Sequence, residues 1–447
     1  MTNSFPPTLS FLKDYDLSGV SNVLQSTGNR DVLLLPARSE EQQENLLNLH
    51  LPSTFEGLLI SPFKTAKEIN HLQRTAQEIS DLEGELINFY YPVDYKVRYV
   101  GVTGTNGKTS VAWIFSEVLK TIGKKALYMG TPGVYLNGVK KDDTVLTTTP
   151  SYLDLRKLLH KYGKEINAVV LEVSSHALAQ MRLKEIAFDS IAWTNLSQDH
   201  LDFHKSMEEY FEAKYKLCTL SRSNLIIPRQ QNELRERLLV RGARIQETVP
   251  YEDHLLEVPA EFERGFTREN LEVALGLALA LYPHKEKIKA NKLTLPPGRI
   301  QKIEKKGVLF FVDYAHTPDA LEKVSIQLKE IYPDKELITV FGCGGDRDKT
   351  KRPQMGAIAQ KMSDKVIVTS DNPRTENPES IIDDIIAGMN DETVLRESDR
   401  KKAIERAFEE AGSNTMILIA GKGHENYQEI GGVRSPFDDS EVVRNLL

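Results

Sequence analysis

The feature that most restricts the fold is an alternation of continuous Val/Ile/Leu runs with helix-like segments, which begins near residue 97. Strands are predicted at 98–102, 168–173, 190–194 and 224–228, an amphipathic helix at 108–120 and an apolar helix at 271–282. Strands that are apolar on both faces occur mainly in parallel sheets that helices cover on both sides. The sequence therefore predicts an α/β fold built on parallel sheets.

A second block of the same kind follows LTLPPGR at 293–299, whose paired prolines are typical of a linker. Its strands are predicted at 308–313, 337–342, 365–370 and 416–420. They lead into four polar loops, DYAHTPD, GCGGDRDKTKR, DNPRTENP and GKGHENY. Ligands bind outside the carboxyl ends of strands in open parallel sheets, so these loops predict a site at one sheet edge. Solvent contact could explain one polar loop, but four such loops favour a site.

The chain length of 447 residues corresponds to two to four domains of roughly 150 residues each. We predict three domains, at residues 1–96, 97–296 and 297–447. The first is leucine-rich and polar, and its strand candidates, VLLLPA and GLLIS, are short. It is therefore expected to be a small α/β domain.

The composition excludes several classes of protein. The net charge of −7 gives no reason to expect binding to nucleic acid or to anionic membranes. No apolar run approaches the roughly 18 residues that span a bilayer, and the N-terminus lacks the pattern of a secretory signal. Two cysteines, Cys218 and Cys343, exclude a disulfide framework and a four-cysteine zinc site. These features predict a cytoplasmic protein without membrane insertion.

A glycine-containing loop, GVTGTNGKTS at 101–110, lies between a predicted strand and a predicted helix. Backbone N–H groups at such a helix start face phosphates, Lys108 adds a positive charge, and Thr109 can offer its hydroxyl to Mg²⁺. The usual pattern has a glycine where Val102 stands, and the additional glycine here is Gly104. The segment is therefore a variant phosphate loop and predicts a nucleotide site.

Polar residues at the ends of the next strands are candidates for a metal site. Glu172 ends the strand at 168–173, and Asp199 with His200 follows the strand at 190–194. Mg²⁺ prefers oxygen ligands and keeps several waters. Glu172 could instead cap the following helix, but its position near the phosphate loop favours the metal.

These motifs resemble those of a known family when they are taken together. GTNGKT, EVSSH, TNLSQDHLDFH, YFEAKYKL, PPGR, VDYAHTPDAL, GCGGDRDKTKRP, DNPRTENP and GKGHE occur in the order found in the ATP-dependent Mur ligases. The match covers about residues 98–430 and is best to members that add the third peptide residue to UDP-N-acetylmuramoyl-L-alanyl-D-glutamate. The resemblance implies a uridine-binding N-terminal domain, a central ATP-binding domain and a C-terminal Rossmann-like domain.

The resemblance also implies the chemistry. ATP phosphorylates a substrate carboxylate, the amine of an amino acid attacks the acyl phosphate, and an amide, ADP and phosphate result. ATP and Mg²⁺ are the implied cofactors, the partners are the UDP-muramoyl dipeptide and the amino acid, and a monomer is expected. The protein must stabilise crowded negative charge, for which Lys108, Mg²⁺ and helix N-termini are suited.

Site residues are carried over by position in these motifs. The catalytic residues are Lys108, His200 and Lys214, of which Lys214 matches the lysine that becomes carbamylated. The ATP-binding residues are Gly104, Thr105, Asn106, Gly107, Lys108, Thr109, Ser110, Asn270, Arg299 and Asp313. The metal residues are Thr109, Glu172, His200 and carbamylated Lys214. The muramoyl-dipeptide residues are Thr148, Thr149, Ser174, Gln180 and Arg182, and the amino-acid residues are Arg347, Asp371, Asn372, Pro373, Arg374, Gly421 and Glu425.

The incoming amino acid is predicted to be meso-2,6-diaminopimelate, because Arg374 of DNPR supplies a fork for its distal carboxylate. L-lysine and a catalytically silent ATP-binding module remain as alternatives. A folylpolyglutamate-type ligase does not explain DNPR with GKGHE, and two cysteines cannot build the zinc insertion of a lipid-linked amidating relative. Near the N-terminus, Gly28, Asn29 and Arg30 stand where the family has Asp-Ser-Arg, so no uridine contact is assigned.

Overall fold

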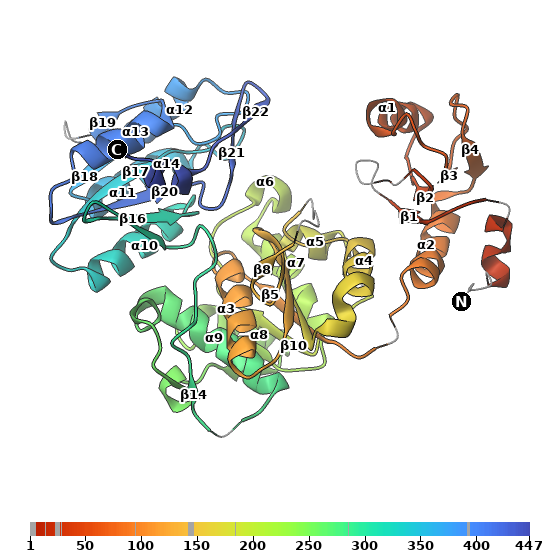
Figure 1. Cartoon of the computed structure of the whole chain (residues 1–447), viewed down its shortest axis with the longest axis horizontal. Helices are drawn as coiled ribbons and strands as arrows, with labels where there is room; N and C mark the ends of the chain where they lie inside the picture. Colours follow the sequence, from red (N-terminus) through yellow and green to blue (C-terminus); the bar gives the residue numbers. More distant parts are fainter. Residues whose placement is uncertain are drawn as a thin grey trace. The chain divides into compact units, whose positions relative to one another are not determined.

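The computed structural model describes residues 6–13, 15–22, 27, 29–93, 95–141, 147–183, 185–284, 286–390 and 394–447. The chain divides into two compact units. One unit consists of Met1–Val97 and Pro150–Asn167, and the other of Arg98–Thr149 and Ala168–Leu447. Figure 1 shows the elements of both, and each unit is described by itself below.

The first unit contains a four-stranded parallel sheet of order β1-β2-β3-β4. Its elements are β1 (Gly19–Ser21), β2 (Asp31–Leu34), α1 (Glu40–His50), β3 (Leu58–Ser61), β4 (Asn70–Gln73), α2 (Ala76–Tyr90) and α4 (Tyr152–Tyr162). Thr75 and Glu78 form a capping box at the start of α2, which fixes where that helix begins. Gly28 lies outside the described residues, whereas Arg30 pairs with Asp16 at 2.7 Å.

The second unit begins with an eight-stranded sheet of order β12-β11-β10-β5-β9-β6-β7-β8. Its strands are β5 (Arg98–Thr103), β6 (Ala126–Gly130), β7 (Gly133–Leu136), β8 (Val139–Lys140), β9 (Ala168–Glu172), β10 (Ser190–Trp193), β11 (Leu225–Ile227) and β12 (Ile245–Glu247). The helices are α3 (Lys108–Thr121), α5 (Ser175–Ala179), α6 (Leu201–His204), α7 (Met207–Thr219), α8 (Asn232–Val240) and α9 (Gly265–Leu281). A short pair, β13 (Leu255–Leu256) and β14 (Ile288–Lys289), lies outside the large sheet.

The second half of this unit is a six-stranded sheet of order β15-β16-β20-β17-β18-β19. The strands are β15 (Gln301–Lys305), β16 (Val308–Asp313), β17 (Glu336–Phe341), β18 (Lys365–Val368), β19 (Val394–Arg396) and β20 (Thr415–Ala420). The remaining elements are α10 (Pro318–Ile331), α11 (Lys351–Met362), α12 (Pro378–Ile386), α13 (Arg400–Glu409), the hairpin β21 (Tyr427–Ile430) and β22 (Val433–Pro436), and α14 (Asp439–Arg444).

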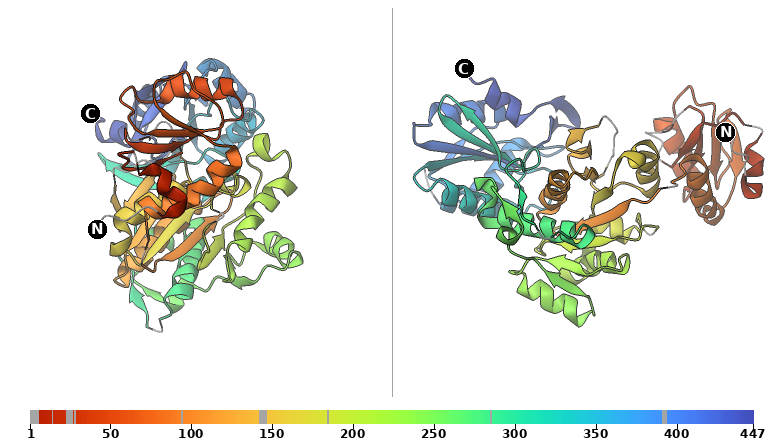
Figure 2. Two further views of the ribbon diagram at one scale, coloured as in Figure 1. Left: turned by 90° about the vertical axis from the view of Figure 1, so that its right-hand side faces the viewer. Right: turned by 60° about the horizontal axis from the view of Figure 1, so that its bottom comes forward.

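Helices cover both faces of the six-stranded sheet (Figure 2). Apolar side chains of α10, α11 and α12 pack on one face, and those of α13 and α14 pack on the other. Successive residues of β16 alternate between the two cores, with Phe310 on one side and Phe311 on the other. Strands β16, β20, β17 and β18 are parallel neighbours, so the four polar loops that follow them meet at one sheet edge, as predicted.

The structure confirms the α/β fold but differs from the predicted elements in two respects. Both large sheets carry antiparallel strands, β7 and β8 in the first and β15 in the second. The helix predicted at 271–282 starts earlier, at Gly265. The first turns of this helix are mostly polar, so the helical spacing of apolar residues, which was the basis of the prediction, does not reach back to Gly265.

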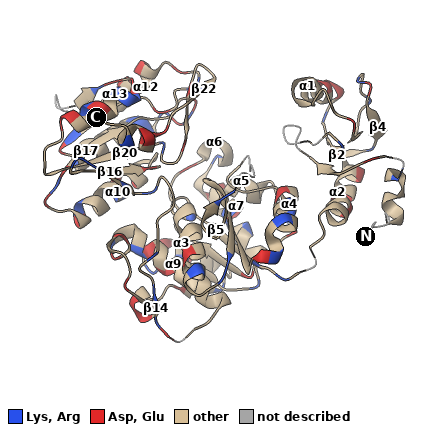
Figure 3. Cartoon of the chain, viewed as in Figure 1, with Lys and Arg blue, Asp and Glu red and all other residues tan. Residues whose placement is uncertain are grey.

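Charged residues of both signs are interspersed over the described helices and strands (Figure 3). Within the described residues, no helix has the length and apolar character needed to cross a membrane.

Candidate functional site

The phosphate loop joins β5 to α3, as predicted. Gly104 and Gly107 have φ angles of 146° and 82°, which side-chain-bearing residues rarely adopt. A Cβ at Gly104 would lie 1.9 Å from Thr194 Oγ1, and one at Gly107 would lie 2.8 Å from Asn270 Oδ1. Glycine at both positions therefore lets the loop approach β10 and α9 closely.

The segment at the end of β10, residues 194–197, holds the phosphate loop in place by hydrogen bonds. Thr194 Oγ1 donates to the carbonyl of Asn106 at 2.5 Å, and the Asn106 amide donates to Asn195 Oδ1 at 2.9 Å. The hydroxyl of Thr105 donates to the Ser197 carbonyl at 3.1 Å and accepts from the Ser197 amide at 3.0 Å. These bonds fix the loop before any ligand arrives.

Glu172, at the end of β9, is fully buried, and both oxygens of its carboxylate accept hydrogen bonds. Its Oε1 accepts from the Tyr128 hydroxyl and from the Thr131 amide at 3.0 Å. Its Oε2 accepts from the hydroxyls of Thr109 at 2.8 Å and Thr131 at 3.1 Å. Burial, reinforced by the carboxylate, raises the pKa of Tyr128 well above its ordinary value. The geometry places this carboxylate next to the first turn of α3.

Two lysines approach the same loop from different helices. Lys108 Nζ donates to the carbonyls of Gly104 at 2.9 Å and Thr105 at 2.8 Å. Lys214, on α7, is 1% exposed, and its Nζ donates to the Gly104 carbonyl at 2.8 Å. Burial lowers the pKa of Lys108, and burial with the nearby Lys108 charge lowers the pKa of Lys214 well below its ordinary value. Lys214 is therefore driven toward the neutral amine.

A cavity of about 230 Å³ lies over the loop, between the two halves of the second unit. Nine of the ten predicted ATP-binding residues line it, and the tenth, Gly104, directly precedes Thr105 in the same loop. Asp313 comes from the end of β16, Arg299 from the linker before β15, and Asn270 from α9. Asp313 accepts hydrogen bonds from the backbone amides of Ile300 at 2.7 Å and Ala315 at 2.8 Å. It therefore also connects the end of β16 to the linker.

His200 lines this cavity and belongs to a cluster of titratable groups. It has a φ of 55°, and its Nε2 lies 3.5 Å from Asp199 Oδ2. Burial lowers the pKa of His200 to about 4, against the pull of Asp199. Burial and the charge of Lys351 likewise lower the pKa of His316 to about 4. Both imidazoles are neutral at physiological pH.

A second cavity, of about 850 Å³, adjoins the first and shares Asp199, His200, Tyr314 and His316 with it. Six of the seven residues predicted to bind the amino acid line it, namely Arg347, Asp371, Asn372, Arg374, Gly421 and Glu425. The seventh, Pro373, lies between two of these in the chain. The structure thus brings all four polar loops to the second cavity, and one of them, DYAHTPD, lines the first cavity as well.

Two features orient the side chains of the second cavity. Asn372 Nδ2 donates to Glu425 Oε2 at 2.7 Å, and burial raises the pKa of Glu425. Arg374 Nη1 donates to the Gly345 carbonyl at 2.6 Å, while its φ of 51° is unusual for a residue with a side chain. Strained backbone of this kind concentrates at functional sites.

The residues predicted to bind the muramoyl dipeptide are only partly gathered. Thr148 and Ser174 line the first cavity, and Thr149 Oγ1 donates to the Glu172 carbonyl at 2.8 Å. Gln180 and Arg182 line neither cavity, but they lie next to Thr149: Arg182 Nη1 donates to the Thr149 carbonyl at 3.3 Å, and its Nε donates to Gln180 Oε1 at 2.9 Å.

The implied Mg²⁺ fits the oxygen donors at the loop. The Thr109 hydroxyl and the Glu172 carboxylate lie 2.8 Å apart, and both line the first cavity. The described residues contain no group of three His, Cys, Asp or Glu side chains that could hold a metal. A sparse protein shell suits Mg²⁺, which takes most of its ligands from phosphates and water.

Comparison with known proteins decides the family. The Mur ligase middle domain matches residues 102–268, and the Mur ligase, glutamate ligase domain matches residues 298–423. The UDP-N-acetylmuramoyl-L-alanyl-D-glutamate--2,6-diaminopimelate ligase of Aquifex aeolicus (strain VF5) is 37% identical over 387 residues, covering 80% of this chain and 79% of that protein. This chain is a Mur ligase.

Solved structures agree with this membership. A structure of UDP-N-acetylmuramoyl-L-alanyl-D-glutamate--2,6-diaminopimelate ligase matches with a TM-score of 0.58 and 30% identity, over 99% of this chain and 98% of that one. The MurF ligase of Thermotoga maritima in complex with ADP shares the fold, with a TM-score of 0.60 and 16% identity over 90% and 93% of the two chains.

Several residues of this Mur ligase site were missed in the sequence. Thr131 and Tyr128 hold Glu172, and an Asn137-Gly138 pair between two short strands would have revealed the hairpin that follows Thr131. Lys422 is fully buried beside Glu425, and nothing in the sequence except its place in GKGHE indicated that it belongs to the site.

Proposed function

We propose that this Mur ligase joins meso-2,6-diaminopimelate to UDP-N-acetylmuramoyl-L-alanyl-D-glutamate, with conversion of ATP to ADP and phosphate. The observation that carries the proposal is that Arg347, Arg374 and Glu425 line one cavity, which adjoins the cavity over the phosphate loop. The name of the Aquifex aeolicus relative supports the same substrate pair.

The first step transfers the terminal phosphate of ATP to a substrate carboxylate. The amides at the start of α3 and the Lys108 ammonium would hold the phosphates, because both place positive charge where negative charge crowds. Thr109 and Glu172 would hold Mg²⁺, which neutralises phosphate charge when it is bound.

Lys214 would act as a carbamate rather than as an amine. Its depressed pKa supplies the neutral nitrogen that can add to CO₂, with loss of one proton and formation of a carbamate anion. The modification would replace a buried amine by a carbamate anion with two oxygens near the phosphate loop. Oxygens of this kind are ligands that Mg²⁺ prefers.

The second step is attack of the amino-acid amine on the acyl phosphate, with loss of a proton and departure of phosphate. Arg347 and Arg374 would bind the carboxylates of diaminopimelate, and Asp371 and Glu425 would face its ammonium groups. L-lysine lacks the distal carboxylate, so the half-buried guanidinium of Arg374 would lose its two-bond partner with that substrate.

The proposal places the reaction in the cytoplasm, where thiols such as those of Cys218 and Cys343 stay reduced, with a monomer as the active unit. The test is phosphate release with ATP, the UDP-muramoyl dipeptide and a panel of amino acids. We expect turnover to require both substrates and kcat/KM to favour diaminopimelate over L-lysine. Preference for L-lysine would overturn the choice of amino acid, and phosphate release independent of both substrates would overturn the ligase.

A further inference from the structure

A fully buried ion pair lies behind the second cavity. Arg400, at the start of α13, and Asp439, at the start of α14, both have side chains with 0% exposure. Arg400 Nε donates to Asp439 Oδ1 at 2.7 Å, and Nη2 donates to Oδ2 at 2.8 Å. Neither residue lines the cavities, so neither touches a substrate.

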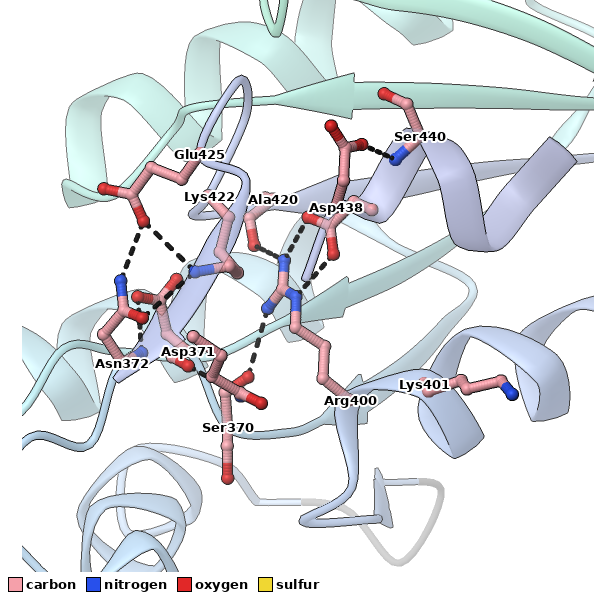
Figure 4. Close-up of polar contacts among 12 residues, drawn as sticks. Ser370, Asp371, Asn372, Arg400, Lys401, Ala420, Lys422, Glu425, Asp438 and Ser440 are labelled. Carbon is pink, nitrogen blue, oxygen red and sulfur yellow. Dashed lines mark hydrogen bonds and ion pairs between the residues drawn. The ribbon is translucent and has the colours of Figure 1, made fainter. Parts of the chain in front are cut away.

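The remaining donors of Arg400 reach two different strand exits (Figure 4). Nη1 donates to the Ser370 carbonyl at 3.3 Å, and Nη2 donates to the Ala420 carbonyl at 3.0 Å. Ser370 directly precedes the Asp371–Arg374 loop, and Ala420 directly precedes the Gly421–Glu425 loop. One rigid guanidinium therefore spans the starts of both loops.

The two loops then meet inside the cavity. Lys422 Nζ lies 3.1 Å from both Asn372 Oδ1 and Glu425 Oε2, and Asn372 Nδ2 donates to Glu425 Oε2. A change in the separation of Ser370 and Ala420 would break this triad. It would also move Glu425 relative to Arg374.

A purely stabilising role does not explain this arrangement. Buried ion pairs are often replaceable by apolar residues of similar volume without loss of stability. What an apolar pair cannot supply is a planar set of donors shared between two carbonyls and a carboxylate. The geometry therefore indicates a role in placing the loops.

We propose that Arg400, held by Asp439, is a positioning residue that fixes the distance between the Asp371–Arg374 and Gly421–Glu425 loops, and thereby the affinity and selectivity for the incoming amino acid. The inference deepens the proposed function and rests on it for the identity of that amino acid.

The test uses the double variant Arg400→Met with Asp439→Leu, which keeps the buried volume but removes the donors. We expect a melting temperature close to the wild type and a KM for diaminopimelate raised about 10- to 100-fold, because small displacements of positioning groups cost that much. The KM for ATP should stay within about twofold, and the preference for diaminopimelate over L-lysine should shrink. Arg400→Lys, which keeps the charge and part of the donor set, should recover part of the loss.

Arg406→Met is the matched control, because Arg406 lies on the same helix in a partly exposed pair with Glu410. It should behave as the wild type. Equal rises in both KM values, or an unchanged KM for the amino acid in a folded double variant, would overturn the inference. If the double variant does not fold, Arg400→Lys decides it by the same two KM values.

Hydrogen exchange separates this inference from the proposed function. Amides of 371–374 and 421–425 should exchange faster in the double variant, whereas those of the phosphate loop should not change. This measurement needs no substrate, so it decides the positioning role even if the wild type uses another amino acid. Unchanged exchange in both loops would refute the role.

Discussion

Replacing Arg374 tests how the second cavity selects its substrate. One of the five N–H donors of Arg374 is used by the Gly345 carbonyl, at 2.6 Å, which leaves enough for a two-bond fork to a carboxylate. The backbone is held independently, since the Arg374 amide donates to the Glu429 carbonyl at 3.0 Å and the Gly431 amide donates to the Arg374 carbonyl. Truncation should therefore remove donors without moving the loop.

The expected loss follows from the fork. A charge-assisted, two-bond pair is worth about 2–4 kcal/mol, which corresponds to a decrease of about 30- to 1,000-fold in kcat/KM for diaminopimelate. For L-lysine, which has no distal carboxylate, Arg374→Ala should change kcat/KM by less than about threefold. Arg374→Lys is the control that keeps the charge and loses the fork, and it should lie between the wild type and Arg374→Ala.

The assay is steady-state phosphate release with each amino acid at saturating ATP and UDP-muramoyl dipeptide. The KM for ATP should not change, because Arg374 does not line the first cavity. Equal losses for diaminopimelate and L-lysine would refute the reasoning. They would mean that Arg374 supports the loop rather than recognising the distal carboxylate.

Lys108→Ala should lose turnover at least about 100-fold in phosphate release while keeping its circular-dichroism spectrum, because the phosphates lose a positioned cation; retained activity would contradict the phosphate-loop assignment. Lys214→Ala should be almost inactive and should not respond to bicarbonate, whereas formate or acetate should restore part of the phosphate release; full activity would remove Lys214 from the mechanism. Urea unfolding should show stability falling as the pH is lowered from 6.5 to 4, because His316 has a pKa of about 4 when folded and binds a proton more readily when unfolded. The slope should be smaller in His316→Gln, by up to about 3 kcal/mol over this range, and an unchanged slope would argue against a buried neutral imidazole.

The parts of the fold that could be predicted are those whose residues face apolar surroundings on both sides. The strand 308–313 was read correctly because every residue of β16 is buried. In contrast, β15 alternates half-buried and exposed residues over Gln301–Lys305, and its polar sequence resembles the linker that precedes it. Its antiparallel pairing depends on the β16 edge, which no local pattern encodes.

The candidate site also has parts that could be predicted from the sequence and parts that could not. The placement of the GVTGTNGKTS loop between β5 and α3 could be predicted, because its glycines stand between a Val-rich run and an amphipathic segment. The role proposed for Arg400 could not, since RKKAIERAFE reads as the polar surface of an amphipathic helix. Only the fold shows that its first residue turns inward to meet Asp439, which lies 39 positions away.

Both cavities are lined from both sheets, but the phosphate loop and the loops proposed to bind the amino acid belong to different sheets, and this has an evolutionary consequence. The phosphate loop and its braces belong to the eight-stranded sheet, whereas Arg374 and Glu425 sit on loops of the six-stranded sheet. Substitutions that retune the choice of amino acid can therefore accumulate without disturbing the energy-coupling machinery. A lineage can change the building block of its polymer by altering a few loop positions, and loop grafting between relatives should be able to retrace such a change.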